Sequence, residues 1–535
     1  MIVPYLRLMY TFPSKPCLSP TKFLHAGVTF HFLCPNQQLW NRSREYLSKM
    51  ALPGLSLPGL GLSNQPASSS SAFGSFSNAV PDSFRTEDLG PRTEWRFEVS
   101  FQLQYNIKLI SGTAELLGTE LAQNHVYKFF GFKGAIFTWQ GCQLELSGHA
   151  ESEYAGLETE YAVEWINLHG MLETARDMAE GTDDGGPRVL VVGPDHVGKS
   201  SLVQCLAGWG VKCGQTPTIV NVDPREGLLA PLGSFTAVTV GSQLDVENGY
   251  GTSPISGPTM TTVKTPVVYH YPHATPNDNL DMYSALVTRT ALSVTNRLEE
   301  DAAAKQAGLI IDTPGMLNDP KSNYSLISHL VSEFSITLIL TIGSERLYND
   351  LIRKFGPKPQ AVEGEAIPVL RISKPGGAVE RDANFTKQLQ NRQIRQYFFG
   401  TAKEPLNPHS QTYSFAELTI YRAKSSSSTD TGSKFASGME DDDDIPYATS
   451  NTASTDFERV PPSNDMLGRL VAIKHCDAGS DDITLRNSAV MGFAYVSEVD
   501  EQKKRVRFLA PHPQRWADKA LVWGTWPEAV TDLVS

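Results

Sequence analysis

No stretch of the 535-residue sequence reaches the roughly eighteen consecutive apolar residues that a membrane-spanning helix needs. Positive charge is also scarce, because 46 lysines and arginines face 58 aspartates and glutamates and leave a formal net charge of −12. A chain without a basic excess has no general attraction for nucleic acid. Any RNA contact would therefore be indirect, weak or confined to a local patch, and we expect no membrane partner.

Cysteine is also scarce. The six cysteines are scattered and show no paired spacing that would suggest a zinc site. They are Cys17, Cys34, Cys142, Cys205, Cys213 and Cys476. Reduced thiols in an intracellular protein are the simplest expectation.

What the chain does contain is ordinary globular material, with 40% hydrophobic residues and a length that suggests about three to four domains. Residues 1–90 predict a disordered extension and a linker rich in serine, and we expect order from about Thr93. Basic residues dominate 1–49, which is typical of a transit peptide. We favour an upstream extension, with the working start at Met50.

Three folded regions follow. Residues 91–182 contain short aromatic and β-branched segments punctuated by glycine, which predict an antiparallel β domain, and end in a helix over about Glu164–Glu180. Residues 183–402 alternate buried strands with helices, which indicates an α/β domain with a parallel sheet. Residues 403–535 predict a β-rich C-terminal domain. Its acidic segment at about 425–460 is interpreted as a disordered, solvated loop.

A phosphate-binding loop opens the central region, in the segment "VLVVGPDHVGKSSL". Gly193, Gly198, Lys199 and Ser200 fit the pattern of a glycine, four variable residues and Gly-Lys-Ser, directly after an apolar strand. Backbone amides and the helix dipole of such a loop bind phosphate. The lysine reaches the terminal phosphates, and the serine hydroxyl coordinates Mg²⁺. We therefore expect a nucleotide and Mg²⁺.

Two aspartates and an arginine are candidates for phosphate chemistry. Asp223 ends the strand "TIVNVD", where it could act on Mg²⁺, accept a proton from a hydroxyl, or merely close a turn. Asp312 in "LIIDTPG" could hold Mg²⁺ directly or through water, so the candidate metal ligands are Ser200, Asp223 and Asp312. Arg381 could neutralise a transferring phosphoryl group, or it is a solvated side chain in a charged helix.

The order of several motifs resembles the family of Clp-type polynucleotide 5′-hydroxyl kinases, whose fungal members are subunits of the pre-mRNA cleavage and polyadenylation machinery. The motifs are "TEWRFEV", "GTEL", "FTWQG", "GPRVLVVGPDHVGKSSL", "SERLYNDL", "GGAVER" and "IRQYFFG". The resemblance covers about Leu89 to the C-terminus. "MALPGL" is similar to the start of fungal members, which supports Met50.

The resemblance implies three domains, with the N-terminal one closing over the adenine of ATP. The ATP-binding positions it implies, together with the phosphate-loop motif, are Glu94, Lys133, Gly193, His196, Val197, Gly198, Lys199, Ser200 and Ser201. In active relatives the residues that match Lys199, Ser200 and Asp223 perform the transfer, and Arg381 matches the first lid arginine.

Two positions depart from the family pattern. Thr386 stands where the second lid arginine is expected, and Met316 and Leu317 follow Gly315 where a tryptophan would stack on the RNA base. A stacking platform contributes about 1–3 kcal/mol per base. A group that stabilises transition-state charge commonly supplies about 10²-fold in rate. The acceptor side of the site is therefore expected to be eroded, while the nucleotide pocket is intact.

Two functions follow. The leading hypothesis is an ATP-binding assembly subunit of the nuclear pre-mRNA 3′-end cleavage and polyadenylation complex, with little or no kinase activity, docked on the scaffold subunit and other subunits of the cleavage factor. The alternative is an active ATP-dependent kinase of the RNA 5′-hydroxyl. A third possibility, a GTPase built on the "DTPG" at 312–315, is weak because no Asn-Lys-x-Asp signature follows.

Overall fold

The computed structural model describes residues 84–535 except for some internal and C-terminal positions. The positions left out are 184, 249–265, 319, 358–365, 402, 404, 425–455, 514–515, 517, 532 and 534–535. The expected extension, the start at Met50 and most of the acidic loop thus lie outside the described residues. Within the described part of the chain, no helix combines the length and apolar character that crossing a bilayer requires.

The N-terminal domain is a sandwich of two antiparallel sheets, with strand orders β1-β8-β3-β6 and β5-β4-β7-β2-β9. Along β3, buried Tyr105, Ile107 and Leu109 alternate with more exposed residues, so one face of the strand enters the core. The expected β domain is confirmed, but β1 precedes Thr93, so ordered structure begins earlier than expected. The strands are β1 Arg85–Leu89, β2 Thr93–Val99, β3 Tyr105–Gly112, β4 Glu115–Leu116, β5 Thr119–Glu120, β6 Val126–Phe129, β7 Phe132–Thr138, β8 Cys142–Gly148 and β9 Ser152–Gly156.

The central domain is built on a seven-stranded sheet of order β13-β12-β11-β14-β10-β15-β16. The five strands from β11 to β16 in this order are parallel, as expected. β12 and β13 add to the edge in antiparallel orientation, which the strand-helix alternation did not predict. No helix lies between β11 and β12, and a parallel neighbour would need a crossover. The strands are β10 Arg188–Val192, β11 Thr218–Asn221, β12 Ser234–Thr239, β13 Val267–His270, β14 Leu309–Asp312, β15 Leu338–Ile342 and β16 Val369–Ile372.

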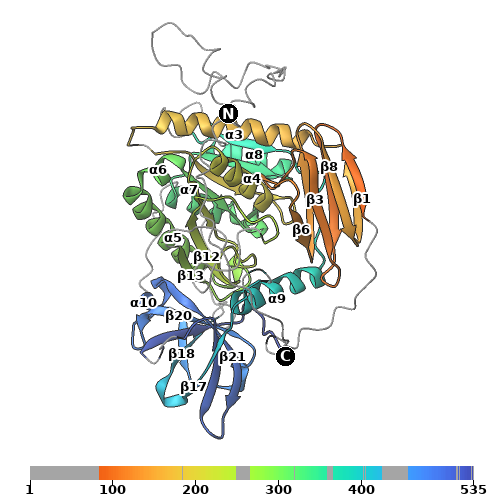
Figure 1. The fold of residues 1–535 in the computed structure, drawn as a ribbon. Helices are drawn as coiled ribbons and strands as arrows, with labels where there is room; N and C mark the ends of the chain where they lie inside the picture. The colour runs from red at the N-terminus through yellow and green to blue at the C-terminus, as the bar shows by residue number, and fades with distance from the viewer. Residues whose placement is uncertain are drawn as a thin grey trace, which may run out of the picture. The chain divides into compact units, whose positions relative to one another are not determined.

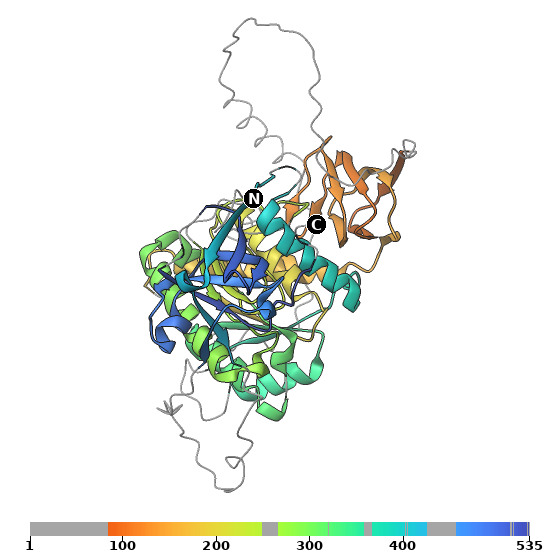
Figure 2. The same ribbon diagram turned by 90° about the horizontal axis from the view of Figure 1, so that it is seen from below.

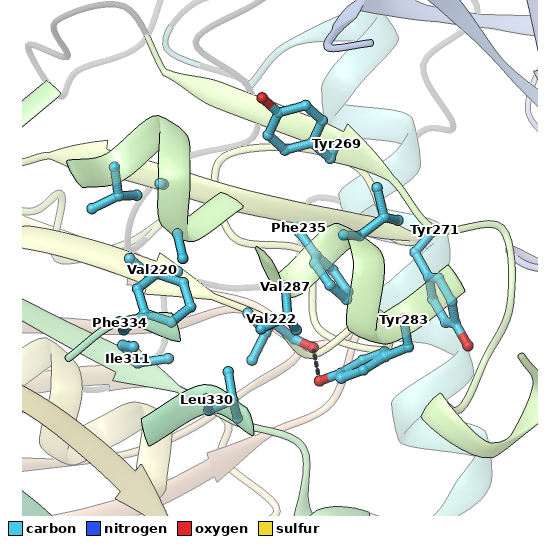
Figure 3. Packing of buried hydrophobic residues seen from close by; sticks show 14 of the residues in the cluster. Val220, Val222, Phe235, Tyr269, Tyr271, Tyr283, Val287, Ile311, Leu330 and Phe334 are labelled. Atoms are coloured by element: carbon cyan, nitrogen blue, oxygen red, sulfur yellow. Dashed lines mark hydrogen bonds between the residues drawn. The ribbon is translucent and has the colours of Figure 1, made fainter. Parts of the chain in front are cut away.

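Helices cover both faces of this sheet. On one face, Trp165, Leu168 and Leu172 of α3 pack with β10 and α4, so this helix joins the central core. On the other face lie α5, α7 and α8, and Figure 3 shows the aromatic and aliphatic side chains of this cluster. There the Tyr283 hydroxyl donates to the Val222 carbonyl at 2.9 Å, which fixes α5 to the end of β11. The helices are α3 Glu160–Ala179, α4 Lys199–Lys212, α5 Leu280–Glu300, α6 Ala302–Ala307, α7 Ser325–Glu333 and α8 Glu345–Phe355.

The C-terminal domain contains a second seven-stranded sheet, of order β17-β22-β21-β20-β23-β18-β19. Only the pair β18 and β23 is parallel among the strand pairs that the structure describes in this sheet. The expected β-rich domain is confirmed, although β19 occupies the last part of the expected loop. The elements are β17 His409–Ser414, β18 Thr419–Ala423, β19 Phe457–Val460, β20 Leu470–Asp477, α10 Asp482–Asn487, β21 Val490–Asp500, β22 Arg505–Ala510 and β23 Lys519–Trp523.

Helix α9, Ala383–Phe399, contacts both flanking domains. Near its start, the Phe385 ring lies 5.1 Å from that of Phe101 in the N-terminal domain. Near its end, the Phe493 amide of the C-terminal domain donates to the Tyr397 hydroxyl at 2.7 Å. Figures 1 and 2 show the helix running between the sandwich and the C-terminal strands. The helix therefore joins all three folded regions.

Candidate nucleotide-binding site

The phosphate-binding loop connects β10 to α4 and has the backbone that its glycines permit. Gly198 adopts φ +93° and His196 φ +60°, both in the left-handed region. A methyl group added at Gly193 would lie 2.4 Å from the Ile342 carbonyl oxygen, so only glycine fits there. The Val197 side chain is buried in the core, which leaves only its backbone for a phosphate. The loop therefore has the geometry of an anion cradle.

Lys199 begins α4 at the N-terminal end of the helix. The side chain is largely buried, and Nζ donates to the Pro194 carbonyl at 2.8 Å. The ammonium thus lies folded across its own loop. Because this bond is made to a neutral carbonyl, a phosphate oxygen would compete with it favourably.

Three carboxylates converge beside Ser200. Asp223 follows β11 and Asp312 ends β14, and these neighbouring parallel strands deliver both to the same edge of the sheet. The third is Glu226, whose Oε2 accepts the Ser200 hydroxyl at 2.9 Å. Burial and the charge of Glu226 raise the pKa of Asp223 to about 6 and the pKa of Asp312 to about 7. Crowded negative charge thus marks the centre of the site.

The carboxylates offer ligands for a divalent cation. Asp312 Oδ1 is buried and has no hydrogen-bond partner among the described residues. An orphaned carboxylate oxygen beside a serine hydroxyl and a second carboxylate supplies the hard oxygen ligands that Mg²⁺ prefers. The expected trio of Ser200, Asp223 and Asp312 therefore fits a magnesium ion.

A small network ties the loop to the segment after β14. Asp195 Oδ1 accepts from Arg225 NH2 at 2.8 Å and from the Gly315 amide at 3.1 Å. A methyl group at Gly315 would lie 2.2 Å from that oxygen, so the contact needs glycine. Arg225 and the Gly315 amide hold the pKa of the Asp195 carboxyl below its usual value despite partial burial. The ionised carboxylate therefore fastens two neighbouring segments across the loop.

The segment between β16 and α9 lies against the phosphate-binding loop. A methyl group at Gly198 would be 3.4 Å from Pro375 Cδ. Arg381 NH1 lies 3.8 Å from Glu226 Oε1, which brings the expected lid arginine to the carboxylate cluster. Thr386 falls in the first turn of α9, and Met316 is 41% exposed.

Glu94 lies inside the N-terminal domain, on β2, and is fully buried. Its carboxylate accepts from Arg96 and from the Tyr161 hydroxyl. A methyl group at Gly377 would lie 3.6 Å from Glu94 Oε1. The residue thus faces the segment before Arg381.

Lys133 also lies in the N-terminal domain, on β7, and contacts the start of α9. Its ammonium pairs with Glu98 Oε2 at 2.7 Å and lies 5.1 Å from the centre of the Phe385 ring. Phe385 is in the first turn of α9, so Lys133 contacts the start of this helix, whereas Glu94 faces Gly377 in the segment before it. The structure therefore gathers both expected adenine-side residues at the region 375–385.

Sequence reasoning missed four side chains that shape this site: Asp195, Arg225, Glu226 and Arg96. Arg225 and Glu226 follow Asp223 by two and three positions, in "VDPREG". Their charges in the same turn as Asp223 were the sequence signal that could have identified them. Asp195 lies inside the loop motif but at a position that the motif leaves variable.

Taken together, fold and site define a P-loop nucleotide-binding protein with a β domain on either side. Family models match three ranges of the chain. They are described as the N-terminal β-sandwich domain of polyadenylation factor at residues 88–179, the P-loop of mRNA cleavage and polyadenylation factor CLP1 at 193–400, and pre-mRNA cleavage complex II protein Clp1 at 406–528.

Individual relatives agree with these matches. The "mRNA cleavage and polyadenylation factor clp1" of Botryotinia fuckeliana is 44% identical over 447 residues, covering 84% of this chain and 94% of the relative. The corresponding factor of Phaeosphaeria nodorum is 45% identical over 454 residues, with the same coverage of both chains. The chain therefore belongs to the Clp1 family of mRNA cleavage and polyadenylation factors.

A solved structure shares the fold. Clp1p in the "wild-type Clp1p-Pcf11p (454 -563) complex" matches with a TM-score of 0.71 and 24% identity, over 83% of this chain and 98% of that chain. A second structure, from work on the interface between Pcf11p and Clp1p and on ATP loss in a point mutant, gives a TM-score of 0.72. The family expected from the motifs is thus confirmed, and so is the three-part fold; the roles of the individual site residues stay predictions.

Proposed function

We propose that the chain is an ATP-binding assembly subunit of the nuclear machinery that cleaves and polyadenylates pre-mRNA, with little or no kinase activity. The observation that carries this proposal is the Asp195 network. It fastens Gly315 to the phosphate-binding loop, and the resemblance puts the RNA acceptor next to Gly315. Met316 follows this fastened glycine in place of an aromatic residue, so the acceptor side lacks a stacking surface while the phosphate-binding loop keeps its cradle.

The phosphate-binding residues have distinct tasks in this proposal. The backbone N–H groups between Gly193 and Ser200, apart from Pro194, which has none, would bind the phosphates, and the Lys199 ammonium, now bonded to the Pro194 carbonyl, would bond to a terminal phosphate oxygen. Ser200, Asp223 and Asp312 would hold Mg²⁺, which supplies positive charge against the phosphates. Glu94, Arg96 and Lys133 lie against the segment 375–385 and would hold it beside the phosphate-binding loop.

A bound nucleotide would stabilise the folded conformation of the chain. Any ligand held only by the folded state adds to the folding free energy by mass action. A locked nucleotide would thus keep the region 375–385 and α9 in one conformation for a partner. The relevant partner is a scaffold protein of the cleavage factor, because the matching Clp1p structures contain Pcf11p.

The second candidate is an RNA 5′-hydroxyl kinase. The position of Asp223 just after β11, beside the phosphate-binding loop, favours it, and burial together with the charge of Glu226 raises the pKa of this carboxyl to about 6, which suits a general base near neutral pH. In that mechanism Asp223 accepts the proton of the RNA hydroxyl. Lys199 and Arg381 stabilise the charge on the transferring phosphoryl group.

One experiment separates the two. The full chain is purified and denatured, the released nucleotide is identified by mass spectrometry, and transfer of labelled γ-phosphate to a short 5′-hydroxyl RNA is measured in parallel. Intact ATP without transfer supports the assembly subunit. Transfer that Asp223→Asn abolishes makes the chain a kinase, and an empty pocket in the pure protein contradicts the proposed retention.

A further inference from the structure

A second cluster of metal-ligating side chains lies away from the nucleotide site, between α3 and α4. These two helices pack against each other (Figure 1). His169 and Glu173 are four residues apart on α3 and so lie on one face of that helix. Cys213 is the residue that caps the C-terminal end of α4. An imidazole, a carboxylate and a thiol thereby meet from two helices.

The distances suit a small tetrahedral ion. An imidazole binds one ion through a single nitrogen, and His169 Nε2 lies 3.6 Å from Cys213 Sγ. One donor atom from each residue lies within 4.8 Å of the other two. With bonds of about 2.0 Å to nitrogen and 2.3 Å to sulfur, tetrahedral zinc separates these two ligand atoms by ~3.6 Å.

The second nitrogen of the His169 ring, Nδ1, is the unpartnered one among the described residues, because Nε2 contacts Cys213 Sγ. His169 is 7% exposed, and its Nδ1 has no hydrogen-bond partner within the described part of the chain. A buried polar atom without a partner normally calls for a ligand, ion or water.

The surroundings hold the carboxylate in place. Arg176 donates to Glu173 Oε1, and Gln215 donates to Glu173 Oε2 at 3.3 Å. A carboxylate has about four acceptor sites, so both contacts leave capacity for a metal bond. Such outer partners commonly orient the ligands of metal sites. Cys213 is exposed, which gives an ion and a water molecule access from solvent.

We propose that His169, Glu173 and Cys213 form a binding site for a Zn²⁺-class ion, with water as the fourth ligand, which ties α3 to the C-terminal end of α4. The mixed nitrogen, oxygen and sulfur donors match zinc and not magnesium or calcium. On binding, the Cys213 thiol releases its proton to solvent and the thiolate sulfur bonds to the metal. No oxidant or further reactant is needed.

The test uses the full chain with Cd²⁺ and Zn²⁺ as probes. Cd²⁺ should give an ultraviolet thiolate-to-metal absorption band that saturates at a single ion per chain. Zn²⁺ affinity is measured by competition with a coloured chelator. Cys213→Ser should remove the band, and His169→Ala should weaken Zn²⁺ binding by more than ~100-fold, since outer-shell changes alone cost about 10–100-fold.

Matched controls keep the result specific. His329 and Glu333 repeat the four-residue His and Glu spacing on α7, at 3.9 Å between Nδ1 and Oε1. Glu333→Gln should leave Zn²⁺ affinity unchanged. Cys17→Ser combined with Cys34→Ser lowers the thiol content and should leave the Cd²⁺ band unchanged.

A wild-type chain without a saturable band, or a band that survives in Cys213→Ser, overturns the proposal. Circular dichroism confirms that each variant is folded.

Discussion

Ser200 donates its hydroxyl to Glu226 at 2.9 Å, so the serine expected to coordinate magnesium is paired with a carboxylate that no motif predicted. Glu226 also lies 3.8 Å from Arg381. One side chain therefore occupies the space between the loop and the expected lid arginine. A metal ion and Arg381 would both be attracted to this carboxylate, whereas a phosphate would be repelled by it.

Replacing Glu226 with glutamine should strengthen nucleotide binding in the absence of divalent metal. The change removes a negative charge beside the phosphates, and we expect roughly three- to tenfold tighter binding of ATP in EDTA. Fluorescence titration with a labelled ATP analogue measures it. Glu345→Gln, on the exposed start of α8, is the control and should change nothing. Weaker binding in Glu226→Gln would show that the carboxylate supports the nucleotide.

The nucleotide-free chain should lose stability as pH rises from about 5 to 8. Asp223 and Asp312 have folded-state pKa values of about 6 and about 7, above the ordinary value, so the folded state binds more protons than the unfolded state in this range. Stability therefore falls as these carboxyls ionise. Asp312→Asn should raise Tm by about 2–4 °C at pH 8 and by less at pH 5. Thermal denaturation at both pH values tests it, and an equal change at both contradicts the assignment.

Lys199→Ala should empty the pocket. A charge-assisted hydrogen bond to phosphate contributes about 1.5–3 kcal/mol, which corresponds to roughly a 10- to 150-fold loss of ATP affinity. Lys212→Ala changes an exposed lysine at the other end of the same helix and is the matched control. Co-purification of a Pcf11-like partner with each variant then tests nucleotide-dependent assembly. If the same amount of partner co-purifies with both variants, docking of the partner does not depend on bound nucleotide.

Restoring the two missing acceptor-side groups should reveal how far the site has diverged. Met316→Trp supplies an aromatic surface at an exposed position and should tighten binding of short 5′-hydroxyl RNA by about tenfold. Thr386→Arg adds a cation in the first turn of α9. Phosphate transfer by the double variant, against none by the parent chain, would show that these positions limit the reaction. Fluorescence anisotropy and labelled transfer provide the two readouts.

The parts that the sequence predicted well are those with local causes. Gly193, Gly198 and Lys199 belong to one contiguous motif. The apolar run of β10 predicts a buried strand from its composition alone. Contacts between distant segments could not be read in this manner. Asp195 meets Gly315 across 120 positions, and Cys213 meets His169 across 44, so neither pair has a spacing that a motif could record.

The flanking antiparallel strands were missed for a related reason. β12 is buried along its whole length, like a parallel strand, so its composition does not report its direction. Direction depends on the connection to β11. For Glu94, the resemblance predicted contact with ATP. Nothing in the sequence indicated that its carboxylate is hydrogen-bonded to Arg96 and Tyr161, as the structure shows.

The order in which the chain is synthesised determines when helix α9 can pack. Its apolar residues, among them Ile394 and Phe398, are covered by Leu470, Phe493 and Val530, which leave the ribosome later. Until those residues are synthesised, the helix has only the part of its packing surface that earlier residues form, among them Ala230, Leu232 and Val268. The contacts of Gly376 with Arg96 and of Phe385 with Phe101 involve residues made earlier, whereas the end of the helix is fixed only when the last domain is complete.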